Sequence, residues 1–221
     1  MSLLISGDLR LSKSQIIPAV IGEPFGGGYF AGFISHTADG NPTHALIVAP
    51  RLEGATGTGY TLTTMLAWKT ANTTTAGTTS DFDGSANTAA MVTAGIADHP
   101  AANFCKNLSI GGFTDWYLPA RYELDIAYFN LKPSTDANST SWGTNIYAVP
   151  QRNINYTATY PAQTALTAFN TTAEAFALVN HWLSSEGDAT NGWRVNFNFG
   201  NQSNLGKTTG TRVRAFRRIA L

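Results

Sequence analysis

Strict alternation of large apolar and polar residues near the C-terminus constrains the fold more than any other stretch of this sequence. Within residues 192–200 the apolar side chains occupy every second position and polar ones lie between them: Trp193, Val195, Phe197 and Phe199 against Arg194, Asn196 and Asn198. A period of two predicts a β-strand with one face in a core and one face in water. We interpret residues 177–221 as three strands of one sheet.

The polar face of this predicted strand continues into an amide-rich turn at residues 201–204. A stiff sheet that presents a row of amide and guanidinium groups favours a binding surface, and no catalytic grouping is visible in this stretch. We predict that a receptor contacts the following side chains: Arg194, Asn196, Asn198, Asn201, Gln202, Asn204 and Lys207.

Aromatic residues in the loop-like region 134–172 supply further candidates. This region carries Trp142, Tyr147, Tyr156 and Tyr160 among Asn, Thr and Pro residues. Exposed aromatic rings in loops are common ligand platforms, although rings that anchor a loop to the core are commoner. We add Trp142 and Tyr147 to the predicted receptor-binding residues.

Charge is scarce in this chain and unevenly distributed. Charged residues make up 13% of the sequence, about half the usual share, and the formal net charge is zero. No global field therefore directs the protein to nucleic acid or to a membrane surface. After Asp188 no acidic residue remains, whereas six cations follow: Arg194, Lys207, Arg212, Arg214, Arg217 and Arg218. They either pair with acids elsewhere in the fold or form a patch for an anionic glycan or phosphate.

The chain divides into a short N-terminal segment and one larger domain. Residues 1–20 contain two short apolar runs that are too small to fold alone, so we predict an assembly arm, with a plain edge strand as the alternative. In the domain formed by residues 21–221, strands are predicted at 29–35 and 44–49, joined by a turn at 39–42.

Helices are predicted in the middle of the domain. One begins near Ala86 with Asp83 or Ser85 as its cap, and a second begins at residues 98–100 and ends at Gly111 and Gly112. A third runs from Pro119 to residues 132–133, and a short one covers residues 173–176. Long loops at 50–82 and 134–172 complete an α+β fold.

The sequence contains no recognisable motif for catalysis or for a cofactor. The single cysteine, Cys105, excludes an intrachain disulfide and lies on the apolar stripe of a predicted helix. The histidines lack zinc spacing, and no nucleophile elbow occurs. We therefore predict no enzyme activity and no cofactor; a calcium site at Asp81, Asp83 and Asp98 is the alternative to turn and cap roles for these acids.

The sequence also bears on membrane insertion and export. No run of eighteen apolar residues occurs, which argues against membrane insertion, and the N-terminus does not resemble a signal peptide.

Three separated motifs carry a family resemblance. Residues 111–124, GGFTDWYLPARYEL, resemble the G-x-D-W-x-L-P-x-x-x-E-L motif of DUF1566-type proteins. Residues 181–186, HWLSSE, are similar to that family's W-S-S-[ST]-E segment, and residues 213–219, VRAFRRI, to its terminal V-R-x-V-R strand. The order and spacing match. We expect Trp116, Leu118 and Trp182 in the core, Asp115 pinning a turn and Glu123 at a helix N-terminus; Ser184, Ser185 and Glu186 should satisfy backbone groups.

The resemblance implies a C-type-lectin-like fold with a twisted antiparallel sheet, two or three helices and long irregular loops. It also implies a receptor-binding protein of a phage tail fibre or tail tip that attaches to a glycan or protein on a host bacterium. On this hypothesis the protein is a virion component and a homotrimer, and its arm contacts other tail proteins. In some relatives the segment corresponding to the Asn-rich residues 191–204 is diversified by retroelements.

Other function classes remain open from the sequence. A bacterial surface or secreted lectin-like module would use the same polar face, and a purely structural tail component would use it against a neighbouring virion protein. A glycan hydrolase needs paired carboxylates that can lie far apart along the chain.

Overall fold

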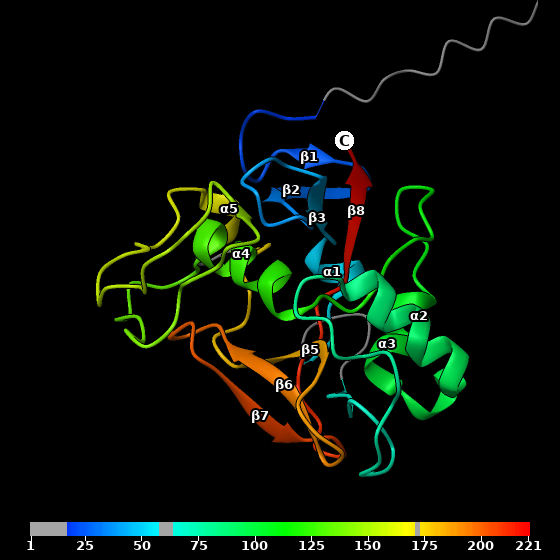
Figure 1. Cartoon of the computed structure of the whole chain (residues 1–221). Helices are drawn as coiled ribbons and strands as arrows, with labels where there is room; N and C mark the ends of the chain where they lie inside the picture. Colours follow the sequence, from blue (N-terminus) through cyan, green and yellow to red (C-terminus); the bar gives the residue numbers. More distant parts are fainter. Residues whose placement is uncertain (1–16, 58–63, 171–172) are drawn as a thin grey trace, which may run out of the picture.

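Two antiparallel sheets, one above the other in Figure 1, organise the fold of the computed structural model, which describes residues 17–57, 64–170 and 173–221. The first sheet has the order β1-β2-β3-β8, with β4 also paired to β2: Pro24–Phe25, Gly28–Ile34, His44–Val48, Phe216–Ala220 and Ala148–Val149. The second has the order β5-β6-β7: Asn180–Glu186, Asn191–Asn196 and Gln202–Gly206. The predicted α+β class is confirmed, whereas residues 1–16 of the predicted arm lie outside the described residues.

The predicted central strand is the middle of the first sheet. β3 lies between β2 and β8, and its residues from Ala45 to Val48 are fully buried. The start of β2 can lie close beside the end of β3 because Gly28 has no side chain: a Cβ there would lie 2.2 Å from the carbonyl oxygen of Val48.

The prediction of three strands in one sheet for residues 177–221 is wrong. Four strands form in this region. The first three, β5, β6 and β7, make up the second sheet, whereas the last one, β8, pairs with β3 in the first sheet. The connecting residues Val213 and Ala215 are fully buried between the sheets. β3 needs a hydrogen-bonding partner on each side, and the C-terminal strand supplies the second one.

The alternating segment is also shorter as a strand than its pattern indicates. β6 ends at Asn196, and a turn closed by the Gly200 N–H donating to the Asn196 carbonyl (2.8 Å) follows. Val195 and Phe197 are buried as predicted, but Phe199 lies within the turn and is 45% exposed.

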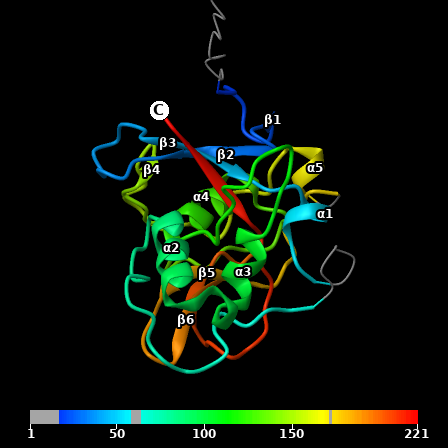
Figure 2. The same cartoon turned by 90° about the vertical axis from the view of Figure 1, so that its right-hand side faces the viewer.

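The main predicted helices are present, and Figure 2 shows α2 and α3 on the side of the molecule that faces the viewer. α2 covers Gly84–Gly95 with Asp83 as its cap, η1 covers Ile96–Asp98, α3 covers Pro100–Lys106, and α4 covers Arg121–Leu131. α3 ends before the predicted glycines.

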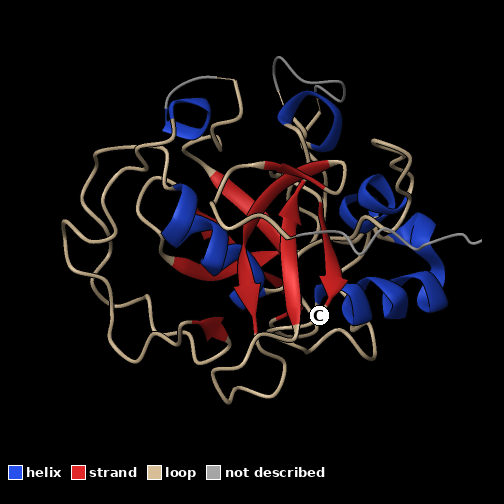
Figure 3. Cartoon of the chain, turned by 90° about the horizontal axis from the view of Figure 1, so that it is seen from above, coloured by secondary structure: helices blue, strands red, loops and turns tan. Residues whose placement is uncertain are grey.

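Two short helices were placed wrongly or missed by the sequence interpretation. α1 covers Arg51–Gly54 and α5 covers Thr167–Asn170, but residues 173–176 form no helix. The Phe176 ring instead stacks on Phe197 with centroids 4.0 Å apart, which holds this segment against the core. Figure 3 shows how much of the remaining chain consists of loops around the strands.

Helix α4 lies between the two sheets and is buried on most of its surface (Figure 1). One apolar cluster joins Leu124, Ala127 and Leu131 of this helix to Leu46 of β3 and Val195 of β6. A second cluster lies beside α2 and α3 and contains Trp68, Trp116, Trp182 and Cys105. The expected core positions of Trp116, Leu118, Trp182 and Cys105 are therefore confirmed.

Motif residues at the ends of these elements tie them together. The Arg217 guanidinium donates to both carboxylate oxygens of Asp115 at 2.8 and 3.0 Å, so Asp115 anchors β8 rather than a local turn. Ser185 Oγ donates to the Ser80 carbonyl, and Glu186 accepts from the Thr75 N–H, as the sequence predicts for polar groups at a strand end.

Glu123 joins the starts of two helices. Its carboxyl group is fully buried and accepts from the N–H groups of Ala120 (2.8 Å) and Gly84 (3.1 Å) and from the Tyr117 hydroxyl (2.7 Å). Burial raises the pKa of Glu123 to about 7 although these donors favour the ionised form.

A raised folded-state pKa predicts that Glu123 destabilises the fold as the pH rises. The folded state holds the proton more tightly than the unfolded state, so its contribution is full below about pH 4.5 and is lost by pH 7. Glu123→Gln mimics the protonated side chain, because its oxygen still accepts from both N–H groups and its amide faces the Tyr117 oxygen. We expect the unfolding free energy of the wild type, relative to this variant, to fall by about 3 kcal/mol between pH 4.5 and pH 8. Urea unfolding at each pH measures it, and a pH-independent difference would contradict the assignment.

Candidate functional site

The predicted receptor-binding residues of β6 and β7 do not share one face of the sheet. In the register of the hairpin, Arg194 pairs with Ser203 and Trp193 pairs with Asn204. Gln202 and Asn204 therefore lie on the face of Trp193, opposite Arg194 and Asn196. The sequence pattern could not predict which face Gln202 and Asn204 occupy, because the length and geometry of the turn determine which residues of β7 share a face with Arg194.

Two of the predicted residues are buried. Lys207 is fully buried, forms an ion pair with Glu186 and donates to the carbonyls of Thr73 (2.9 Å) and Ala189 (3.0 Å). Gln202 is 4% exposed, and its side-chain oxygen accepts from Arg121 Nε at 3.0 Å. Neither side chain can reach a ligand, so both drop out of the predicted surface.

Trp142 and Tyr147 anchor loops rather than line a platform. The ring of Trp142 is half-buried and meets Trp193 edge to face with centroids 6.3 Å apart. Tyr147 stacks on Phe82 with centroids 4.4 Å apart and an interplanar angle of 16°. Their contacts match the anchoring alternative for the loop aromatics.

A partly exposed polar group remains around Arg194. The oxygen of the Asn180 side chain accepts from Arg194 Nη1 at 2.7 Å and from Asn196 Nδ2 at 3.0 Å. Asn198 and Asn201 in the following turn are also partly exposed, and Asn204 on the other face is exposed.

Arg194 has no carboxylate partner among the described residues. Its Nε is buried and unpartnered there, and so is Oδ1 of Asn198. Burial lowers the pKa of Arg194. Four other C-terminal cations instead pair with acids: Lys207 with Glu186, Arg214 with Glu174, Arg217 with Asp115 and Arg218 with Asp83.

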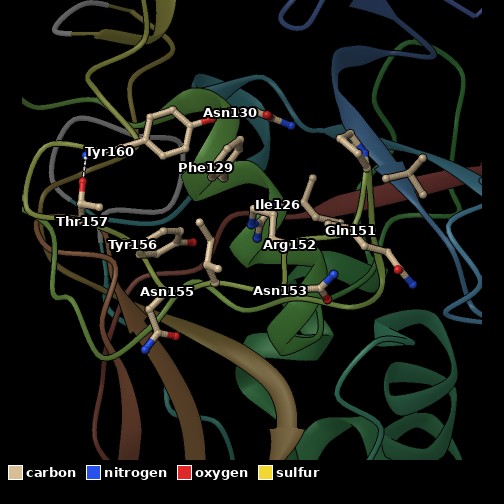
Figure 4. Close-up of a pocket in the computed structure, with 14 residues that line it drawn as sticks. Ile126, Phe129, Asn130, Gln151, Arg152, Asn153, Asn155, Tyr156, Thr157 and Tyr160 are labelled. Atoms are coloured by element: carbon tan, nitrogen blue, oxygen red, sulfur yellow. Dashed lines mark hydrogen bonds between the residues drawn. The ribbon is translucent and has the colours of Figure 1, made fainter.

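A pocket that the sequence analysis did not identify lies between α4 and residues 148–160 (Figure 4). Its volume is about 330 Å³, and most of its wall is apolar. Phe129 and Tyr160 lie together on one side in Figure 4, and Asn153 and Asn155 lie on the other. The Tyr160 ring is 58% exposed, whereas Tyr156 is 4% exposed and anchors the loop. Aromatic residues in this loop were the one signal that could have located it.

A buried carboxylate holds the wall of this pocket in place. Asp125 of α4 forms an ion pair with Arg152 and accepts from Asn145 Nδ2 at 2.8 Å and from the Tyr156 hydroxyl. The Arg152 guanidinium lies over the Phe129 ring, 4.4 Å from its centroid, and its Nε donates to the Gly143 carbonyl. Asn145 and Arg152 also exchange two backbone hydrogen bonds.

Two of the three acids considered for calcium form ion pairs with arginines. Asp81 pairs with Arg121 at 2.9 Å, and Asp83 pairs with Arg218 at 2.7 Å and caps α2. Within residues 17–57, 64–170 and 173–221, no cluster of three or more His, Cys, Asp or Glu side chains is arranged to hold a metal ion. Across the same residues, no helix combines the length and the apolarity that crossing a membrane requires.

Comparison with known protein families identifies the family. A family model described as the Lcl C-terminal domain matches residues 57–217, which is most of the chain. The protein belongs to the Lcl C-terminal domain family. This is a DUF1566-like family, so the resemblance seen in the motifs is confirmed at that level. No curated protein matches the sequence.

The match covers the features that build both candidate sites. It includes β5, β6 and β7, the helices from α2 to α4, and the wall of the pocket at residues 148–160. The matched region of this Lcl C-terminal domain also includes both partners of the Asp115–Arg217 ion pair.

The buried Lys207–Glu186 pair predicts a large effect on stability. Lys207→Met leaves the Glu186 carboxylate buried without its cation, and we expect a loss of about 3–5 kcal/mol in unfolding free energy. The double variant Lys207→Met with Glu186→Gln removes the orphaned charge and should recover part of this loss. Chemical denaturation of the two variants and the wild type measures both effects; equal stability of Lys207→Met and wild type would show that the pair is not buried.

Proposed function

We propose that this chain is a non-enzymatic adhesin of a phage tail fibre or tail tip that binds an anionic group on a bacterial surface receptor. Membership of the Lcl C-terminal domain family supports a DUF1566-like binding domain. We further propose that its fold is C-type-lectin-like, a description with which two antiparallel sheets, flanking helices and long loops agree.

The observation that carries the proposal is the uncompensated guanidinium of Arg194. A charge that is withdrawn from water and left without a full set of partners costs free energy, and a bound anion would offset that cost. A carboxylate or phosphate accepts two parallel hydrogen bonds from one guanidinium group, which Lys cannot offer. Arg194 is half-buried and has no carboxylate partner among the described residues; because its Nε is itself buried, an anion would contact the part of the guanidinium that remains exposed.

Neighbouring polar groups give the site a direction. Asn180 holds Nη1 of Arg194, and Asn196 donates to the same amide oxygen, so both strands position the guanidinium. Ser203 pairs with Arg194 in the register and shares its face. These neutral groups suit hydroxyls beside an anion, as on an acidic glycan.

Weak binding by one copy is compatible with attachment. In a homotrimer joined through the N-terminal arm, several copies would bind one cell at once, which raises avidity by ~10²–10⁴ without new contacts. The proposal therefore places the protein in the virion with other tail proteins as its assembly partners.

Arg194→Gln tests the proposal. The substitution removes the charge while an amide can still reach Asn180, so we expect an unchanged or slightly higher melting temperature. We expect binding to carboxylated or phosphorylated envelope glycans to weaken by ~10–100-fold, the worth of one charge-assisted contact. Glycan-array binding and adsorption of the labelled chain to bacterial cells measure the effect.

Lys106→Gln serves as the matched control. Lys106 is an exposed cation in the last turn of α3, outside the second sheet, and its removal should leave binding unchanged. Equal losses in both variants would indicate non-specific charge attraction. Binding to purified tail proteins but to no bacterial cell would favour the structural tail component.

A further inference from the structure

We propose that the pocket between α4 and residues 148–160 is a second binding site, which takes a neutral sugar that carries an acetamido group. The site is separate from Arg194: its wall comes from α4, β4 and the loop after β4, not from β6 or β7. A failure of the Arg194 experiments would leave this proposal intact.

The pocket is held in shape before any ligand arrives. Arg152 and Asn145 exchange backbone hydrogen bonds of 2.7 and 3.0 Å, and the Tyr156 N–H donates to the Trp142 carbonyl at 2.6 Å. Asp125 connects Arg152 and Tyr156 to α4 beneath them. Binding to a wall fixed in this way does not need to order the loop first, which lowers the entropic cost.

The electrostatics of the pocket favour an uncharged ligand. Arg152 is the cation in its lining, and the buried carboxylate of Asp125 neutralises it. The guanidinium is also covered by the Phe129 ring. An anionic ligand would compete with Asp125 for donors that are already used, whereas a neutral one would not.

The apolar and polar parts of the lining fit different parts of one sugar. Phe129 and Tyr160 meet edge to face with centroids 5.3 Å apart, and the exposed Tyr160 ring offers a flat apolar surface to the C–H face of a pyranose. Ile126, Val149 and Ile154 add aliphatic surface of the kind that buries a methyl group. An acetamido substituent carries such a methyl.

Amide side chains supply the polar contacts. Among the described residues, Asn153 and Asn155 have no hydrogen-bond partner for their side chains, and each offers one acceptor and two donors. Gln151 donates to the Ala38 carbonyl at 2.6 Å and keeps its oxygen. Hydroxyls both donate and accept, so a ring of amides is complementary to a sugar. The volume of about 330 Å³ lies at the small end of the range for small-molecule sites.

A matched pair of disaccharides tests the assignment. N,N′-Diacetylchitobiose and cellobiose have the same linkage and differ by acetamido groups in place of hydroxyls. We expect the purified full chain to bind diacetylchitobiose at least ~10-fold more tightly than cellobiose in isothermal titration calorimetry. No heat of binding for diacetylchitobiose up to roughly 10 mM would overturn the proposal. Equal affinities for diacetylchitobiose and cellobiose would show that the acetamido group is not recognised.

Two variants and one control locate the binding. Tyr160→Ala should weaken diacetylchitobiose binding by about 5–10-fold, and Asn155→Ala tests the amide contacts without touching the rings. Phe199→Ala is the control, because Phe199 is exposed to a similar extent, 45%, outside the pocket. Near-UV circular dichroism checks folding. Equal affinity of Tyr160→Ala and wild type for diacetylchitobiose would disprove the site. Concentration-dependent self-association of the wild type that Tyr160→Ala abolishes would also disprove it, because a second copy of the chain would then occupy the pocket.

Discussion

Burial of helix α4 on most of its sides is the constraint on which the rest of the structure depends. The apolar residues of this helix are too widely distributed around its axis for one sheet to cover. The helix therefore needs both sheets, and the C-terminal chain must cross from one to the other to close the space around it. That crossing takes Val213 and Ala215 through the interior and delivers β8 to β3. The long loops then cover the surfaces that strands leave open.

The crossing also explains why the basic C-terminus does not form a basic surface. Arg214, Arg217 and Arg218 enter the space between elements, where each meets a carboxylate from a distant part of the chain. Such pairs add little net free energy compared with apolar contacts, but a wrong arrangement would leave a buried charge alone. They therefore favour one register of β8. Arg194 lies outside this arrangement, on a strand that ends before the crossing begins.

Local sequence patterns predicted most helices and strands, whereas the sheet to which a strand belongs and the burial of polar side chains depended on long-range pairing. The capping and helix-breaking residues around α2 and α4 can be recognised from short stretches of sequence. The same is true of the apolar run of β3 and of the core positions of the motif tryptophans. The burial of Lys207 depends on Glu186 and on the carbonyl of Thr73, more than one hundred residues away in the chain, which no periodicity encodes. The opposite faces of Arg194 and Gln202 depend on a turn geometry of the same hairpin. The pocket forms only when residues 148–160 pack against α4, and the one sign of it in the sequence is the number of aromatic residues in that loop.

Helix α4 is a rigid link between the pocket and the strand that carries Arg194, which it contacts on the opposite face. Arg121 at the start of α4 lies over the ring of Trp193 in the second sheet, 3.8 Å from its centroid, and Phe129 near the other end lines the pocket. Phe129 is eight helical steps from Arg121, a rise of about 12 Å that cannot stretch or shorten while the helix is intact. Because the helix and the strand are both rigid, the separation of the two candidate sites is fixed, and a polymer could occupy both only if its repeat length matched that separation.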